Sequence, residues 1–253
     1  MEGFFALARK EFLEQRRTWR FAGATGVFVA VAVLTIIIPL IISLDRGEER
    51  TAEDARILLV IFGLTMGTVG ALVSMIVAMG LLANERSTGT AGMTLSKPVT
   101  RAAFVLVKHL GLIITLLGSL FVAVVVSYLL ALAFYGDPGF PRYLLYMAIV
   151  GVWIVFMGSV TLFWSSMFRR QLLAGGLAAL IFFAQFPLTA IPHTDMFWPA
   201  NGPTWGSSYI EGATLFGDSG PPNADWWPTL PISLGSIVLL GTGAWAVFRR
   251  KEL

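Results

Sequence analysis

Six long apolar runs without Asp, Glu, Lys or Arg constrain the fold of this 253-residue chain more than any other feature. A bilayer core of about 30 Å requires roughly 20 helical residues, so each run is long enough to cross a membrane as a helix. Charged residues make up only 13% of the chain, against about 25% in soluble domains. We predict an all-α integral membrane protein, a single transmembrane domain over 1–253 with spans at about 21–44, 57–83, 105–135, 143–168, 172–191 and 231–248.

The Lys and Arg residues are distributed unevenly between the segments that join these runs. Fourteen of the 18 lie in the N-terminal segment, the loops after the second and fourth runs, and the C-terminal tail. Because cytoplasmic loops carry an excess of basic residues, both termini are expected in the cytoplasm of a prokaryotic cell, with the chain multi-pass in its cell membrane. The pI near 9.4 then indicates contact with anionic membrane lipids rather than with nucleic acid.

An amphipathic helix is predicted over 1–20, before the first run. Its aromatic residues recur at intervals of seven, while its charged residues lie largely on other sides of the helix. We expect it to lie in the inner membrane interface with its apolar side toward lipid. A docking surface for a cytoplasmic partner is the alternative use of its charged face. The residues assigned to this interfacial helix are Phe5, Lys10, Glu11, Phe12 and Trp19.

Several function classes are disfavoured by what the chain lacks. Zero cysteines exclude disulfides, thiolate metal sites and thiol catalysis. The apolar runs lack the acidic and basic side chains that proton- and ion-coupled carriers place at membrane depth. His193 and Asp195 would offer a metal ion only two ligands. We therefore predict neither a catalytic residue nor a metal site.

Small residues recur at intervals of three or four along the second run. Such a face allows two helices to approach closely. It would serve either packing within one subunit or a seam between two subunits. The residues are Gly63, Gly67, Gly70, Ser74 and Ala78.

A polar island, NERSTGTAGMTLSKPVTR, separates the second and third runs. Gly89 and Gly92 permit close backbone approach, and Pro98 would stop a helix that began near Ser87 or Thr88. The predicted shape is one short helix followed by a turn. Taken by itself, the island is equally consistent with a solvated loop.

Three segments together resemble a known family. They are ARKEFLEQRR near the N-terminus, NERSTGTAGMTLSKPVTRAAFVLVKHLG in the middle and VFRRKEL at the C-terminus. Their order and spacing are similar to those of the membrane subunit of an ABC-2 type transporter, a permease that a separate ATPase drives. The resemblance implies six transmembrane helices, an N-terminal amphipathic interfacial helix and a short cytoplasmic coupling helix between spans two and three.

The resemblance also implies which residues couple the permease to its ATPase. In the family, the loop between spans two and three holds the coupling helix, which sits in a groove on the ATPase, and Lys108 matches the pattern farther along. This chain has Ala91, Gly92 and Met93 where relatives often carry an acidic and Leu-rich core, so a weaker helix is expected. The residues assigned to the coupling interface are Glu85, Arg86, Gly89, Thr90, Leu95, Ser96, Pro98 and Arg101.

The function implied by the resemblance is transport of a substrate across the cytoplasmic membrane, outward, driven by ATP. We expect two permeases with two ATP-binding subunits, with the permeases as a homodimer or a heterodimer. ATP and Mg²⁺ would be bound by the partner, because no lysine of this chain lies in a Gly-x-x-x-x-Gly-Lys pattern. No cofactor is expected in this chain. A membrane scaffold or anchor subunit that does not transport is the alternative.

The fifth run contains one strongly polar side chain, Gln185. A Gln in hydrocarbon tends to form a hydrogen bond with another helix, so a structural link between spans is one interpretation. If the run instead lines a cavity between two permeases, as the resemblance suggests, the translocation path would include Phe182, Gln185 and Phe186.

The segment 193–229 is predicted to be an outer loop. It has no Lys or Arg and holds half of the chain's eight Trp residues. Aromatic rings of this kind are typical of the membrane headgroup level. A lid over the exit of the path, or a docking site for an outer-side protein, is the alternative.

Overall fold

The structure, a computed structural model, describes residues 2–47, 49–90, 100–188, 199–207, 210 and 228–250. Within these ranges all regular secondary structure is helical. The elements are α1 (Glu2–Arg17), α2 (Arg20–Arg46), α3 (Ala52–Met79), α4 (Ala83–Ser87), α6 (Arg101–Tyr135), α7 (Phe140–Met167), α8 (Gln171–Leu188), η2 (Pro199–Asn201), α9 (Gly202–Ser207) and α10 (Thr229–Arg249).

Five of these helices are long and apolar enough to cross a membrane: α2, α3 with α4, α6, α7 and α10. The protein is therefore a multi-pass, all-helical membrane protein. Helix α8 occupies the place of the fifth predicted span, but it is shorter, with 18 residues and Pro187 inside its last turn. Within the described residues, five helices therefore meet the length and composition of a membrane span, and α8 is a shorter apolar helix at the remaining predicted position.

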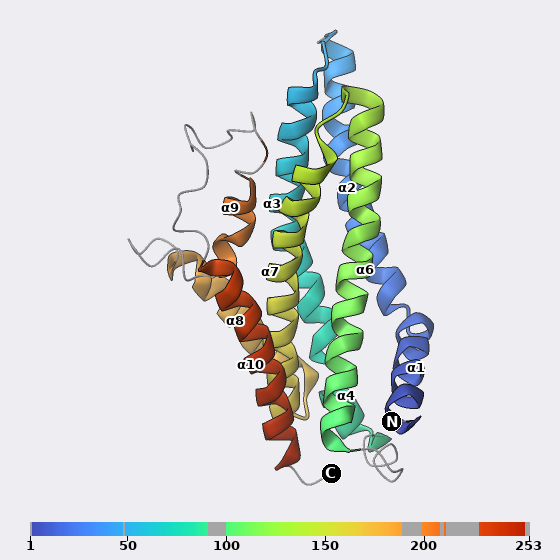
Figure 1. The fold of residues 1–253 in the computed structure, drawn as a ribbon, viewed down its shortest axis with the longest axis vertical. Coiled ribbons are helices and arrows are strands. Elements are labelled where there is room, and N and C mark those ends of the chain that lie inside the picture. Colours follow the sequence, from blue (N-terminus) through green and yellow to red (C-terminus); the bar gives the residue numbers. More distant parts are fainter. Residues whose placement is uncertain are drawn as a thin grey trace.

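Helix α7 is central in this arrangement. It packs against α3, α6, α8, α9 and α10, while α2 packs mainly against α6. The start of α1 and the end of α10 lie at the same end of the bundle as α4, and the connections from α2 to α3 and from α6 to α7 lie at the other end (Figure 1). We call these the inner and outer ends, following the predicted orientation.

The small residues of the second run face α7 of the same chain. Gly63 lies against Tyr146, and Gly70 lies against Ile154. The indole nitrogen of Trp153 donates a hydrogen bond to the Gly67 carbonyl at 2.7 Å. These glycines are buried, as are Ser74 and Ala78. Of the two uses predicted for this face, the structure shows packing within one subunit.

The N-terminal helix buries one of its faces against the bundle. Its buried residues Leu7, Glu11 and Gln15 lie one and two turns apart on one face, and α1 packs against α6. Trp19 lies beyond the end of α1, in a left-handed junction with φ of 59°, and is 77% exposed. Glu11 therefore faces the bundle, and Trp19 lies outside the helix that carries the other residues assigned to it. The side chains of Phe5 and Phe12 fall outside the described part.

Part of the predicted outer loop is folded against the bundle. Pro203 of α9 lies beside Gly67, and Gly206 lies beside Tyr146. This short helix packs against both α3 and α7. Of the four tryptophans predicted to line this loop, Trp205 lies in α9, and Trp198, Trp226 and Trp227 lie outside the described residues.

Candidate functional site

A buried cluster of charged side chains joins three helices at the inner end. The Lys108 ammonium of α6 lies 2.7 Å from Glu11 Oε2 of α1, and it also pairs with Glu85 of α4. The side chains of Lys108 and Glu11 are 3% and 4% exposed. Gly111, one turn along α6, makes room for this approach, because a Cβ there would lie 3.2 Å from Glu11 Cγ. We call Glu11, Glu85 and Lys108 the inner ion cluster.

Neighbouring polar groups hold the inner ion cluster in place. Glu11 accepts a hydrogen bond from Gln15 Nε2 at 3.2 Å, and Gln15 Oε1 accepts one from Thr115 at 3.4 Å. The Lys108 Nζ also lies 5.7 Å from the centre of the Phe104 ring. Removing one partner of a buried ion pair leaves an uncompensated charge, so the cluster favours the joined arrangement of the three helices.

The cluster holds more negative than positive charge. Carboxylate oxygens of Glu11, Glu14 and Glu85 lie within 4.8 Å of one another. Glu85 Oε2 is buried and has no hydrogen-bond partner among the described residues. Three carboxylates at this spacing could in principle coordinate a cation. The Lys108 ammonium already lies between two of them, which makes the arrangement an ion-pair network.

Helix α4 is fixed to the inner end of α7 by two serines. Ser165 Oγ accepts hydrogen bonds from the backbone nitrogens of Leu82 and Ala83, at 3.2 and 3.0 Å, and donates one to the Met79 carbonyl at 2.9 Å. Arg86 Nη1 donates to the Ser166 carbonyl at 2.9 Å. Ser165 therefore satisfies backbone groups where α3 ends and α4 begins, and it holds α4 at a defined position.

The chain turns sharply directly after α4. The Thr88 hydroxyl donates to the Asn84 carbonyl at 2.9 Å, and the Thr90 hydroxyl donates to the Glu85 carbonyl at 3.3 Å. Gly89 has φ of +74°, and no atom lies within 4 Å of a Cβ built on it. Here glycine is required by the backbone conformation and not by space.

Of the predicted coupling residues, the structure places Glu85 and Arg86 in α4 and Gly89 and Thr90 at the turn after it, whereas Leu95, Ser96 and Pro98 lie outside the described part. The described chain resumes at Thr100, whose hydroxyl accepts a hydrogen bond from the Ala103 nitrogen at 3.2 Å and so caps α6. Arg101 Nη1 donates to the Arg249 carbonyl of α10 at 3.0 Å. Both ends of the predicted coupling segment are thus attached to the helical bundle.

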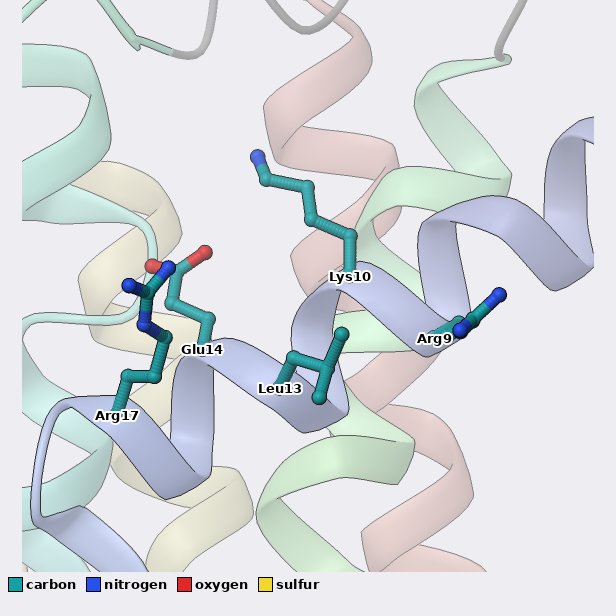
Figure 2. A pocket seen from close by; sticks show the side chains of 5 residues that line it. All are labelled: Arg9, Lys10, Leu13, Glu14 and Arg17. Carbon is teal, nitrogen blue, oxygen red and sulfur yellow. The ribbon is translucent and has the colours of Figure 1, made fainter.

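Two open grooves flank the inner ion cluster. One groove, of about 570 Å³, runs along the exposed side of α1. It is lined by Arg9, Lys10, Leu13, Glu14 and Arg17. Figure 2 shows these side chains projecting from α1, with Leu13 between the charged groups. Its three basic side chains and one acidic side chain give the groove a net positive charge, which is complementary to an anionic surface. Lys10, one of the residues assigned to this helix, lines the groove.

The second groove, of about 520 Å³, lies beside α4. It is lined by Asn84 and Ser87 on one side and by Arg169, Arg170, Gln171, Leu172 and Leu173 on the other. In the sequence, the basic pair Arg169 and Arg170 serves only to predict the orientation of the chain in the membrane. Their position next to the coupling segment was not predicted, because it depends on how α7 and α4 pack.

The residues of the candidate translocation path lie on α8. Gln185 is 4% exposed and Phe182 is 2% exposed. Gln185 Nε2 lies 3.8 Å from Met157 Sδ of α7, and the Phe182 ring stacks near Trp153 with centres 6.3 Å apart. Within one subunit both residues face α7. The side chain of Phe186 falls outside the described part.

Comparison with known proteins agrees with this architecture. A search of curated proteins finds no match to the chain. The model of a family described as "ABC-2 family transporter protein" matches residues 5–253. Because that match covers nearly the whole chain, this membrane protein belongs to the ABC-2 transporter family, whose members are membrane components of transport systems that work with an ATP-binding subunit.

Proposed function

We propose that this chain is the permease subunit of an ABC transporter and that it moves its substrate outward across the cytoplasmic membrane. A separate subunit binds ATP and Mg²⁺ and docks on the segment from Glu85 to Arg101. The observation that carries this proposal is the inner ion cluster, since it links α4, at the start of the docking segment, to α1 and α6.

This linkage provides a route for mechanical coupling. A force on the segment after Gly89 reaches α4 directly, because Thr88 and Thr90 are bonded to the α4 backbone. Separating Glu85 from Lys108 would leave the Glu85 carboxylate without its cation, which is unfavourable at this largely buried position. A displacement of α4 is therefore expected to carry α1 and α6 with it, instead of breaking the cluster.

The proposed assembly contains two copies of this chain, most simply as a homodimer, and two ATPases. The grooves lined by Lys10 and Arg17 and by Arg169 and Arg170 flank the docking segment and offer positive charge to the partner or to anionic lipid. In this proposal α8 acts as a sixth membrane segment, both termini are cytoplasmic, and the segment 193–229 faces outward, where an outer-side protein has room to dock.

The proposal is tested by co-purification of a candidate ATP-binding subunit with this chain. Gly89→Pro should abolish it, because proline fixes φ near −65° whereas Gly89 has φ of +74°. The segment would then leave α4 in another direction. Membrane insertion should be retained, since Gly89 is exposed at a turn.

Gly47→Pro provides a matched control at the outer end. Gly47 also has a positive φ, +65°, and a Cβ there would meet no atom within 4 Å. This variant should keep the ATPase bound, because the change is far from the docking segment (Figure 1). Undiminished co-purification of Gly89→Pro would contradict the proposed docking site.

A further inference from the structure

A cavity with a largely apolar wall and several charged groups at its rim lies at the outer end of the molecule, between the ends of α2, α3 and α6. Its volume is about 260 Å³, somewhat below the roughly 300–1,000 Å³ typical of sites for drug-sized ligands. A small group therefore fits it better than a whole large molecule. Its polar lining consists of Ser43, Glu49, Arg50, Asp54 and Tyr135.

Tyr135 contributes a hydroxyl group that the protein leaves unsatisfied. The residue is only 6% exposed, and its hydroxyl has no hydrogen-bond partner in the described part of the chain. Ser43 lines the same cavity and lies near enough to act on the Tyr135 hydroxyl. Its own hydroxyl donates instead to the Leu40 carbonyl at 2.9 Å, and no hydrogen bond of ordinary geometry joins it to Tyr135. Buried hydroxyl groups normally have partners. The Tyr135 hydroxyl is thus the group that a ligand in the cavity would satisfy.

The charged side chains around the cavity favour a ligand that carries both a positive and a negative charge. Arg50 provides one cation, and Glu49 and Asp54 provide two carboxylates. Asp54 is held in place because its Oδ2 accepts hydrogen bonds from the nitrogen and the hydroxyl of Thr51, both at 2.8 Å. An anion alone would meet more negative than positive charge here. A group with a phosphate and an ammonium would find a partner for each.

The other walls and the position of the cavity indicate where such a ligand comes from. Pro39, Ile42, Ile57 and Leu58 form the apolar lining, and Ile42 is 44% exposed on the side of the bundle. The cavity lies where three membrane-length helices begin or end, which is the level of lipid headgroups. A phospholipid could place its headgroup in the cavity and its acyl chains along α2.

We propose that this cavity binds the headgroup of a phospholipid with a primary ammonium group, of the phosphatidylethanolamine type. The ammonium donates hydrogen bonds to Glu49 and Asp54. The phosphate accepts from the Arg50 guanidinium and from the Tyr135 hydroxyl. This site is separate from the inner ion cluster and does not depend on the proposed transport function.

The test uses the purified full chain in detergent. Phosphatidylethanolamine, phosphatidylcholine and phosphatidylglycerol with identical acyl chains are titrated, with thermal shift and native mass spectrometry as readouts. The ethanolamine lipid should bind most tightly, because the choline headgroup lacks N–H donors and the glycerol headgroup lacks a cation. Equal binding of the three lipids would overturn the proposal.

Tyr135→Phe should lower the affinity for phosphatidylethanolamine about tenfold, since one hydrogen bond to a charged group is lost. In lipid-free detergent the same variant should be no less stable than the wild type, because it removes a hydroxyl without a partner. Tyr128→Phe is the matched control on α6, since its hydroxyl donates instead to Asp137 at 2.8 Å. An unchanged affinity in Tyr135→Phe, or an equal loss in Tyr128→Phe, would overturn the assignment.

A last experiment distinguishes binding of a phospholipid from binding of a soluble molecule with the same headgroup. Glycerophosphoethanolamine carries the headgroup without acyl chains. It should stabilise the protein far less than the lipid at equal concentration, because the apolar wall has nothing to bind. If it stabilised the protein equally, the site would belong to a soluble zwitterion and the lipid proposal would be wrong.

Discussion

The ring of Tyr146 in α7 lies so close to the Cα of Gly63 in α3 that a Cβ atom at position 63 would overlap it. The Tyr146 hydroxyl also donates a hydrogen bond to the Val60 carbonyl at 3.1 Å. The backbone conformation of Gly63 is ordinary helix, so glycine is required here only by space. This contact sets how closely the two helices approach.

Gly63→Ala should therefore destabilise the protein by about 1–3 kcal/mol, the usual cost of overpacking a close-packed interior. The measurement is the melting temperature of the purified protein in detergent. Gly26→Ala is the control, because a Cβ there meets no atom within 4 Å and alanine favours helix more than glycine does. Equal melting temperatures for the two variants would contradict the tight packing of α3 on α7.

Lys108→Met should destabilise the protein by about 3–5 kcal/mol, because it leaves the carboxylates of Glu11 and Glu85 buried side by side without their cation. Thermal unfolding in detergent measures this effect. The variant should also uncouple ATP hydrolysis from transport wherever it still folds. Lys10→Met, which removes an exposed cation one residue from Glu11, should change stability by no more than about 0.5 kcal/mol.

A further variant tests whether the stability lost in Lys108→Met comes from the broken ion pairs or from altered packing. Adding Glu11→Gln and Glu85→Gln to Lys108→Met removes the uncompensated charges, so the triple variant should recover much of the lost stability. A triple variant that is less stable than Lys108→Met would show that the uncompensated carboxylates are not the cause of the lost stability.

Single cysteines at Ser96 and Ser219 should be labelled from opposite sides of the membrane, cytoplasmic and outer respectively. The chain has no native cysteine, so the labelling needs no background correction. A membrane-impermeant maleimide applied to intact cells and to inverted vesicles is the measurement. Labelling of both positions from one side would mean that an odd number of membrane crossings has been misassigned between them, with α8 the first helix to reconsider.

Gln185→Leu distinguishes the two interpretations of α8. Gln185 Oε1 is buried and has no partner within the described residues, so its replacement by leucine should not lower thermal stability. If Gln185 and Phe182 line the translocation path, substrate-stimulated ATP hydrolysis of the complex should change while basal hydrolysis stays the same. An unaltered substrate response with a lower melting temperature would assign Gln185 to helix packing.

Much of the fold follows from local sequence. The helices α2, α6, α7 and α10 begin and end within about four residues of the predicted spans, because the preference of a side chain for lipid or water is a property of that side chain and accumulates along the run. The end of α3, the turn at Gly89 and the cap at Thr100 are equally local. Helix α8 also begins and ends within about four residues of its predicted span, but it is the shortest of these apolar helices.

The pairing of residues across helices was decided by tertiary structure. Lys108 lies 97 residues from Glu11 and 23 from Glu85, and no sequence period relates the three. Whether Glu11 faces lipid headgroups or α6 depends on the rotation of α1 about its own axis, which packing against Gly111 sets. The same holds for Ser165 beneath α4 and for Tyr135 in the outer cavity. Hydropathy determines that a segment enters the membrane, whereas the side chains that meet there are determined by the angles and rotations at which the helices pack.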